Sequence, residues 1–423
     1  MKRILALILS VLMIIPAFSA CGEKGFDPDE PITLTVCVEQ RFIEARVDED
    51  LEELISYFYP EIHLEFEALA NGGMEREQQL SRLRTEIVSG EGPDIFLLNT
   101  YQMDYRDTCE PLFVDVEKTM RNRIFLPLDE YIAESEHYIP EEHLQIVMDA
   151  GKLDGEQLVL PLLYSMDLNL YDAEKVAGLE FPNWDNVDGC GDPALIKSLG
   201  TGFSRFNRII DEIADYDELK LSITEEELLH YTKLNYSIYR LENVEDLGFD
   251  TDIVGGELND NYLQNIRFLP GEVYAHPQYD ISGGVTAFVE AYAAINANTE
   301  YPEAAFKVVE LLFSEEVQSD RGFEEAKCGG SLCPRWSAYN TYQGVATGKA
   351  ACRDPVLYKE GFLDSVNEKI TNVRFNSELD KAIYDMNITI WNEILDSKWR
   401  EPDVDFERYV SECYSDMKMM IAE

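Results

Sequence analysis

The chain has 423 residues and carries 35 Lys and Arg against 82 Asp and Glu, which gives a formal net charge of −47. This charge excludes binding to nucleic acids or anionic membranes through electrostatics, because both need Lys and Arg to neutralise phosphates. With 45% hydrophobic residues, the chain is too apolar for a disordered acidic tail. At roughly 100–200 residues per domain, its length suits two or three domains, or two lobes sharing one chain.

The first 20 residues are expected to be a secretory signal. Lys2 and Arg3 precede an apolar run over 4–15, which is too short to span a hydrocarbon core of about 30 Å. Phe18-Ser19-Ala20-Cys21 is similar to a bacterial lipobox, which implies cleavage before Cys21 and acylation of its thiol. An ordinary secretory cleavage site is the alternative. Residues 21–31, which are polar with Gly and Pro, then form a lipid-anchored tether.

Cysteine and histidine usage predicts neither a disulfide scaffold nor a metal centre. Seven of the 8 cysteines remain after Cys21, and an odd number cannot pair completely. Cys328 and Cys333 are close enough in sequence to close a small loop, either as a disulfide or as two free thiols. The sequence contains neither Cys-x-x-Cys nor His-x-x-x-His, so we expect no transition metal and no cofactor.

The N-terminal region has the pattern of an α/β fold. Alternating apolar residues predict strands over 32–38 and 62–66, and helical spacing predicts helices over 47–58 and around 80–87. A continuous apolar run over 95–98 is typical of a strand covered on both faces. The order β-α-β-α-β favours a parallel sheet with right-handed crossovers.

In such sheets, ligands bind beyond the carboxyl ends of the strands. Two of these ends fall at Glu39-Gln40-Arg41 and Asn99-Thr100-Tyr101. Farther along, Asp154-Gly155 predicts a tight hairpin turn, and the strand that leaves this hairpin is expected to cross into a second lobe near 163–165.

The second half of the chain is predicted to be mainly helical. One helix is expected to carry Phe206, Ile209, Ile210 and Ile213, and the next is opened by the Thr224-x-x-Glu227 capping box. Pro302 suits a first helical position, and apolar stripes predict two helices in about the last eighty residues.

Catalytic motifs are missing from the sequence. There is no P-loop, no Gly-x-Ser-x-Gly elbow and no His-Glu-x-x-His. With 82 carboxylates, close pairs arise by chance, so a glycosidase pair cannot be inferred. The acidic run over 246–252 lacks the alternating spacing of a calcium loop and reads as a solvated face.

Several short motifs, in their order and spacing, resemble the extracellular solute-binding proteins, which are the lipoprotein receptors of ABC importers, and among them the carbohydrate-binding branch. The resemblance covers about 18–340, and between about 180 and 265 the chain lacks the usual Gly-x-Ala-Ala-Met stretch. The motifs are Gly92-Pro93-Asp94-Ile95-Phe96-Leu97-Leu98, Leu126-Pro127-Leu128-Asp129-Glu130-Tyr131, 151–162, Ala294-Ile295-Asn296-Ala297-Asn298, 302–306 and 314–318.

The resemblance implies the two-lobed periplasmic-binding-protein-like type II fold, an α/β architecture with a ligand cleft between lobes joined by hinge strands. Residues 32–162 and 285–340 are expected to form lobe 1, and 163–284 and 341–423 lobe 2. The chain crosses between them near 163–165 and near 284–288, and the C-terminal helices pack mainly on lobe 2.

The resemblance further implies a monomeric receptor, lipid-anchored on the extracytoplasmic face of the cell membrane, that performs no catalysis. It captures a small solute, in the first place a sugar or oligosaccharide, and delivers it to an ABC transporter permease. Two alternatives stay open. One is a receptor of the same fold for a peptide, polyamine or other small solute, and the other is a secreted glycan hydrolase.

Candidate ligand-binding residues follow from position, at strand ends, at the crossings and in one later loop. Each also has a structural alternative to ligand binding. Tyr101 could be ordinary loop surface, and the two glycines could simply form a turn. The candidates are Gln40, Asn99, Thr100, Tyr101, Tyr164, Asp167, Gly283, Gly284, Arg335 and Trp336.

Overall fold

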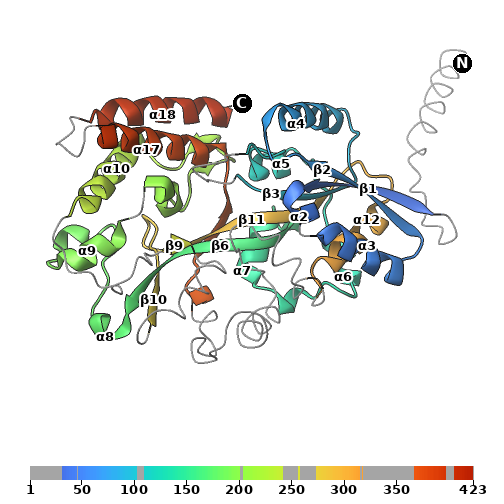
Figure 1. Ribbon diagram of the computed structural model, residues 1–423, viewed down its shortest axis with the longest axis horizontal. Coiled ribbons are helices and arrows are strands. Elements are labelled where there is room, and N and C mark those ends of the chain that lie inside the picture. Colours follow the sequence, from blue (N-terminus) through green and yellow to red (C-terminus); the bar gives the residue numbers. More distant parts are fainter. Residues whose placement is uncertain are drawn as a thin grey trace, which may run out of the picture.

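The structure is a computed structural model that describes residues 31–44, 46–101, 109–200, 203–241, 256–257, 273–314, 317, 366–396 and 404–422. Its centre is an eight-stranded sheet in the order β10-β6-β11-β3-β1-β2, in which β12 also pairs with β11 and β9 with β6 (Figure 1). The strands are β1 (Ile32–Glu39), β2 (Ile62–Leu69), β3 (Ile95–Asn99), β6 (Val159–Asp172), β9 (Gly256–Glu257), β10 (Val273–Pro277), β11 (Thr286–Ile295) and β12 (Asn372–Phe375).

The predicted N-terminal unit is confirmed. β1 pairs in parallel with both β2 and β3. The connections are α3 (Val47–Phe58), which follows the short α2 (Gln40–Glu44), and α4 (Gly73–Val88). α3 buries Val47, Leu51 and Ile55, the face that the helical spacing marks as apolar.

The predicted hairpin turn is also present, between β4 (Lys152–Leu153) and β5 (Glu156–Gln157). Asp154 and Gly155 both have positive φ, at 54° and 87°, as a tight two-residue turn requires.

Two long antiparallel strands connect the two halves of the molecule. β6 pairs with β11 from Val159 to Met166, and from Leu168 onward it pairs with β10 instead. β11 correspondingly pairs with β3 at its C-terminal half and with the parallel strand β12 at its N-terminal half. Figure 1 shows both strands running between the part with α3 and α12 (Pro302–Leu311) and the part with α17 (Glu378–Asp396) and α18 (Phe406–Ala422).

Each half has its own core. In lobe 1, one sheet face packs against α3 and α12, and the other against α4 and α5 (Val116–Arg121). In lobe 2, α17 and α18 pack with α10 (Glu225–Tyr239) in a core that includes Leu228, Ile390 and Met417. The chain is thus a two-lobed α/β protein, in which the terminal helices α17 and α18 share one core with α10.

The remaining helices and short strands lie around these cores. Thr224 and Glu227 form the predicted capping box at the start of α10. These elements are α6 (Asp129–Glu134), α7 (Gln145–Met148), α8 (Ala173–Val176), α9 (Pro193–Leu199), β7 (Ala214–Asp215) and β8 (Lys220–Leu221), together with the 3₁₀ helices Pro140–Glu142, Asp149–Gly151, Val187–Gly189 and η5 (Phe203–Ile209).

The prediction of a helix that runs from Phe206 to Ile213 is wrong. The segment is the 3₁₀ helix η5, which ends at Ile209. The guanidinium of Arg374 donates to the carbonyl oxygens of Asn207 and Ile210, at 3.1 Å each, so these acceptors serve a distant side chain instead of a continuing helix.

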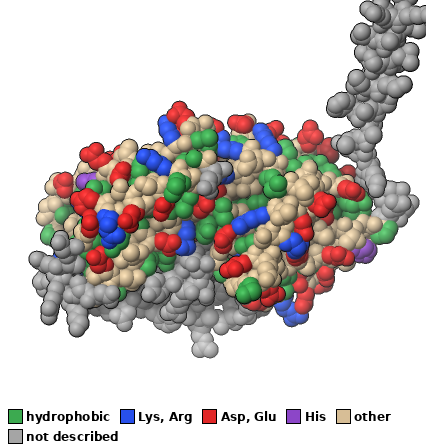
Figure 2. Space-filling view, turned by 90° about the horizontal axis from the view of Figure 1, so that it is seen from above, with side chains coloured by type: hydrophobic (Ala, Val, Ile, Leu, Met, Phe, Trp, Pro, Cys, Tyr) green, Lys and Arg blue, Asp and Glu red, His purple; other side chains and the backbone are tan. Residues whose placement is uncertain are grey.

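Acidic side chains cover much of the surface. Figure 2 shows Asp and Glu scattered over the face seen from above, in keeping with the net charge of −47. Among the helices that the structure describes, none has both the length and the hydropathy needed to cross a bilayer.

The buried ion pair between Arg374 and Asp380 provides a stability test. Asp380 is fully buried and accepts two bonds from Arg374, at 2.7 and 2.8 Å. Asp380→Ala leaves a buried guanidinium unpaired, so we expect the free energy of unfolding to fall by about 3–5 kcal/mol in urea denaturation. Asp385→Ala, on the same helix, breaks only the exposed pair with Lys381 and is expected to cost about 0.5 kcal/mol or less. Equal losses for the two variants would contradict this account.

Candidate functional site

The crossing strands carry an uncommon set of polar side chains on one face. Ser165 of β6 pairs directly with Phe288 of β11, so both side chains lie on the same face of the sheet. We call this the hinge face. Asp167, two residues after Ser165, lies on it as well, and the hydroxyl of Ser165 donates to the carboxylate of Glu290 on β11.

Arg208 of η5 joins these side chains. Its Nη2 donates to Ser165 Oγ at 2.8 Å, its Nε to Asp167 Oδ2 at 3.1 Å and its Nη1 to Glu290 Oε1 at 3.4 Å. The guanidinium carbon lies 4.1 Å from the centroid of the Phe288 ring. Only a planar guanidinium with several donors can make these contacts together. We call Ser165, Asp167, Arg205, Arg208 and Glu290 the hinge cluster.

The charges of the hinge cluster compensate one another. Arg205 also donates to Asp167, so two guanidiniums face two carboxylates. The side chains of Asp167, Arg208 and Glu290 are only 8–11% exposed, and ions so far from water are tolerated only when they are paired. Arg205 is 34% exposed, which makes it the most accessible ion of the cluster.

The predicted residues at the end of β3 lie beside this cluster. The backbone N–H of Thr100 donates to the carbonyl of Glu290 at 3.0 Å, and its hydroxyl donates to the carbonyl of Val289 at 2.8 Å. Asn99 and Tyr101 flank it and are 6% and 8% exposed. Burial raises the pKa of Tyr101 to about 12, which keeps its phenol neutral and able to donate a hydrogen bond.

Gln40 lies at the start of α2, directly after β1, the strand next to β3 in the sheet. The structure therefore brings the predicted ends of β1 and β3 together at one edge of the sheet.

Tyr164 lies on the opposite face from the hinge cluster. It pairs with Val289, is fully buried, and donates from its hydroxyl to Asn367 Oδ1 at 2.9 Å. In the structure as described, this side chain packs the crossing.

Gly283 and Gly284 form the turn that precedes β11. Asp280 Oδ1 accepts from the N–H of Gly284 at 2.8 Å, and Gly283 has a φ of 81°. A Cβ on Gly284 would lie 2.3 Å from Thr371 Oγ1, so no larger residue fits this turn without a shift. Arg335, Trp336 and the predicted acylation site Cys21 lie outside the described residues.

Sequence reasoning missed Ser165, Arg205, Arg208 and Glu290. One signal was available, because Glu290 is the only charged residue in the otherwise apolar run of β11. The two arginines gave none, since they lie in a segment that reads as an ordinary helix. No group of three or more side chains suited to a metal occurs in the part of the chain that the structure describes.

Several solved solute-binding proteins are similar to this chain in structure. An extracellular solute-binding protein family 1 member from Alicyclobacillus acidocaldarius matches with a TM-score of 0.57 at 13% identity, covering 94% of this chain and 100% of that one. The sugar-binding protein MalE from Xanthomonas citri matches with 0.58 at 13%, covering 92% and 98%. An ABC substrate-binding protein from Listeria monocytogenes, in complex with cycloalternan, matches with 0.54 at 14%, covering 93% and 100%.

Other comparisons limit what these matches mean. No family model and no curated protein matches the chain. Chains from two structures titled as designed esterases also match, with TM-scores of 0.52 and 0.55, so the fold alone does not decide between binding and catalysis. At these identities the likeness shows the fold, which is the two-lobed fold of solute-binding proteins with a ligand cleft between lobes joined by hinge strands.

The hinge cluster predicts a coupling between Arg208 and Glu290. Arg208→Met removes the guanidinium that pairs with the buried carboxylates of Asp167 and Glu290, so we expect a loss of about 3 kcal/mol in urea denaturation. Adding Glu290→Gln removes one of these two charges and is expected to restore about 1 kcal/mol or more. Arg205→Met, at a more exposed position, is the control and should cost about 1 kcal/mol or less. If the double variant lost the sum of the stabilities lost in the two single variants, Arg208 and Glu290 would not be coupled.

Proposed function

We propose that the chain is an extracytoplasmic receptor that binds a sugar or oligosaccharide between its lobes and delivers it, unaltered, to an ABC transporter permease. The observation that carries the proposal is the hinge cluster, which joins strands of both lobes directly beside the carboxyl end of β3. Ligands of open α/β sheets bind at such strand ends.

The chemistry of this region suits a neutral, hydroxyl-rich solute. Because its two arginines and two carboxylates compensate one another, the cluster offers many hydrogen-bonding atoms without a net charge. Buried polar groups reject ligands that lack matching hydroxyls, and the ring of Tyr101 is suited to pack against a sugar. Two of the similar structures, a sugar-binding MalE and a complex with cycloalternan, support the same class.

Binding between lobes also explains why two strands cross. A solute that contacts both lobes favours the arrangement in which the lobes approach each other, and the lobes rotate about the crossing strands. We assign 32–162 and 285–340 to lobe 1, and 163–284 and 341–423 to lobe 2. The solute contacts are assigned to the sequence candidates at the strand ends and crossings, led by Gln40, Asn99, Tyr101 and Asp167, together with Arg205.

The hinge cluster offers no activated serine or cysteine nucleophile. The hinge cluster contains neither a histidine nor a cysteine, so its only hydroxyl, on Ser165, has no imidazole to activate it. The same hydroxyl is already donated to Glu290.

A saccharide screen tests the function. We expect the purified chain from residue 22 onward to be stabilised by one class of saccharide, by about 2.7 kcal/mol at a hundredfold excess over Kd, with no product on chromatography. Arg205→Ala should weaken binding about tenfold, and Lys220→Ala, an exposed cation on the same lobe, should not. Formation of product would contradict the receptor and favour a secreted glycan hydrolase. Stabilisation by peptides or polyamines alone would show that the solute is not a sugar.

Cys21→Ala tests the membrane anchor. Expressed in a bacterium, the unaltered full chain is expected to enter the detergent phase on phase separation, because several acyl chains hold a protein stably in a membrane. The variant should move to the aqueous phase, whereas Cys190→Ala should behave like the unaltered chain. An unaltered chain found in the aqueous phase would favour the ordinary secretory signal.

A further inference from the structure

A short helix of lobe 1 is bonded to lobe 2. α5 belongs to the core of lobe 1, because Val116 and Met120 pack with the sheet there. Polar groups on this helix and just before it nevertheless contact the β7–β8 hairpin and both terminal helices, which share the core of lobe 2. α5 therefore joins the two lobes at a place other than the crossing strands.

One of these contacts is a hydrogen bond between Asp115 and Tyr216. Asp115 is the N-cap of α5, where its Oδ1 accepts from the backbone N–H of Lys118 at 2.9 Å, and it is only 4% exposed. Its other oxygen, Oδ2, accepts from the hydroxyl of Tyr216, a residue of the β7–β8 hairpin that packs against the core of lobe 2. A single buried carboxylate thus satisfies a helix end in lobe 1 and a phenol in lobe 2.

The same region of lobe 1 provides partners for the ends of both terminal helices. Glu378, the first residue of α17, donates its backbone N–H to the carbonyl of Val114 at 3.0 Å. Near the end of α18, the carbonyl of Met420 accepts from Lys118 Nζ at 2.7 Å. Terminal N–H and carbonyl groups lack partners within their own helix, and a cation at a helix C-terminus is favourable as well.

The C-terminal end of α5 carries a further contact between the lobes. Arg121 forms an ion pair with Asp217 of the β7–β8 turn, and its guanidinium carbon lies 5.9 Å from the centroid of the Tyr216 ring. The side chains of Arg121 and Asp217 are 31% and 78% exposed, so this pair alone contributes little. Its effect adds to that of the other contacts along α5. We call Asp115, Lys118, Arg121, Tyr216 and Asp217 the interlobe cluster.

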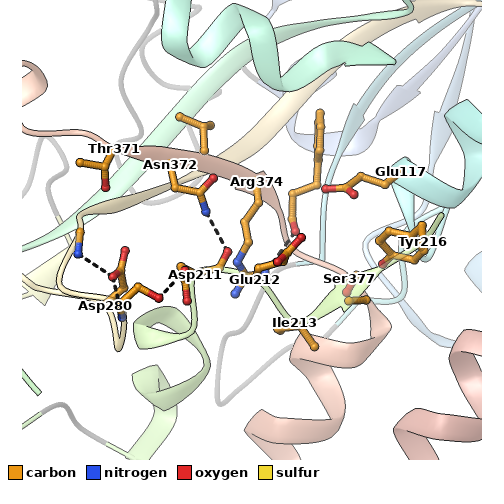
Figure 3. Close-up of a pocket in the computed structure, with 15 residues that line it drawn as sticks. Glu117, Asp211, Glu212, Ile213, Tyr216, Asp280, Thr371, Asn372, Arg374 and Ser377 are labelled. Carbon is orange, nitrogen blue, oxygen red and sulfur yellow. Dashed lines mark hydrogen bonds between the residues drawn. The ribbon is translucent and has the colours of Figure 1, made fainter. Parts of the chain in front are cut away.

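A cavity of about 530 Å³ lies between these parts of the two lobes, beside β12 (Figure 3). Glu117 of α5 lines it from lobe 1, and the carboxylates of Asp211, Glu212 and Asp280 line it from lobe 2. Arg374 is the single cation among the lining residues. Because carboxylates on the two walls repel one another, the closed arrangement of the lobes needs attractive contacts beside the cavity.

The interlobe cluster supplies such contacts at the edge of this cavity. Figure 3 shows Glu117 and Tyr216 in the wall of the cavity, and Glu117 follows Asp115 by two residues. Since members of the cluster lie on elements of both walls, the lobes cannot separate here without breaking the bonds between them.

We propose that the interlobe cluster is a latch, which holds the lobes closed and slows release of the solute through residues that do not line the cavity, such as Lys118 and Arg121. This inference rests on the proposed function, in which the solute binds between the lobes. Each contact of the cluster forms only when the lobes are close, so each stabilises the closed arrangement. A solute enclosed by the lobes leaves only after the latch has opened.

Small-angle X-ray scattering of the chain from residue 22 onward tests the latch without any solute. Lys118→Met/Arg121→Met, the latch variant, removes two of its cations, so we expect a larger radius of gyration because the lobes separate more often. Lys152→Met/Lys381→Met is the control. It removes the same charge, but from ion pairs that each lie within one lobe, and its radius should equal that of the unaltered chain.

A charge exchange distinguishes the latch from a general loss of structure. Arg121→Asp places a carboxylate opposite Asp217 and should enlarge the radius of gyration, because like charges now meet across the lobes. Adding Asp217→Arg restores a pair of opposite charges in reverse order and should return the radius to its original value. A structural defect caused by the first substitution would not be repaired by the second.

Release of the solute gives a second readout. For the saccharide that stabilises the chain most in the screen, the dissociation rate should rise about tenfold in the latch variant and stay unchanged in the control. The association rate should be the same in both, because the latch forms after the solute has been captured.

Two results would overturn the latch. One is an equal radius of gyration for the latch variant and its control, and the other is an equal dissociation rate for these two variants. If the unaltered chain binds no saccharide while the radius still increases in the latch variant, the proposed function fails and the latch stands.

Discussion

The structure depends on the pairing of β6 with β11. These two strands run through both lobes, so every residue at their centre must satisfy the core of one lobe, the core of the other and the crossing between them. Apolar side chains meet this requirement on the reverse face, where Val289 packs with α5. On the hinge face, Ser165 and Glu290 introduce polar groups, and Arg208 reaches both of them from lobe 2.

This arrangement makes the crossing geometrically specific. A hydrophobic contact tolerates sliding, but Arg208 must keep three partners on two strands at hydrogen-bond distance. The Arg374–Asp380 pair does the same at the start of α17, where it holds η5 against β12. Two guanidiniums thus fix how lobe 2 is attached to its crossing strands, while Phe288 lies between them at 4.1 and 4.6 Å.

The sequence predicted those parts of the fold in which local pattern and tertiary structure agree. The N-terminal βαβ unit, the Asp154-Gly155 turn and the capping box of α10 each follow from spacing within about fifteen residues. It failed at η5, because the carbonyls that end the helix are occupied by Arg374, more than 160 residues away. β12 was missed for a related reason. Its four residues form a strand only because β11 offers an edge there.

The candidate site likewise has a part that the sequence predicted and a part that it did not. Position in a parallel sheet is a local inference, and it placed Gln40, Asn99 and Tyr101 at one edge, near Asp167. The partners of Asp167 were not accessible to such reasoning, since ion pairs between distant segments leave no periodic signal. The net charge of −47 does not describe the local environments, because charge acts locally once water is excluded. On the hinge face arginines cancel the carboxylates, which suits a neutral solute, whereas beside β12 the single arginine is already paired and the acidic surplus remains. One acidic chain therefore presents a charge-compensated cluster on the hinge face and an acidic surplus beside β12.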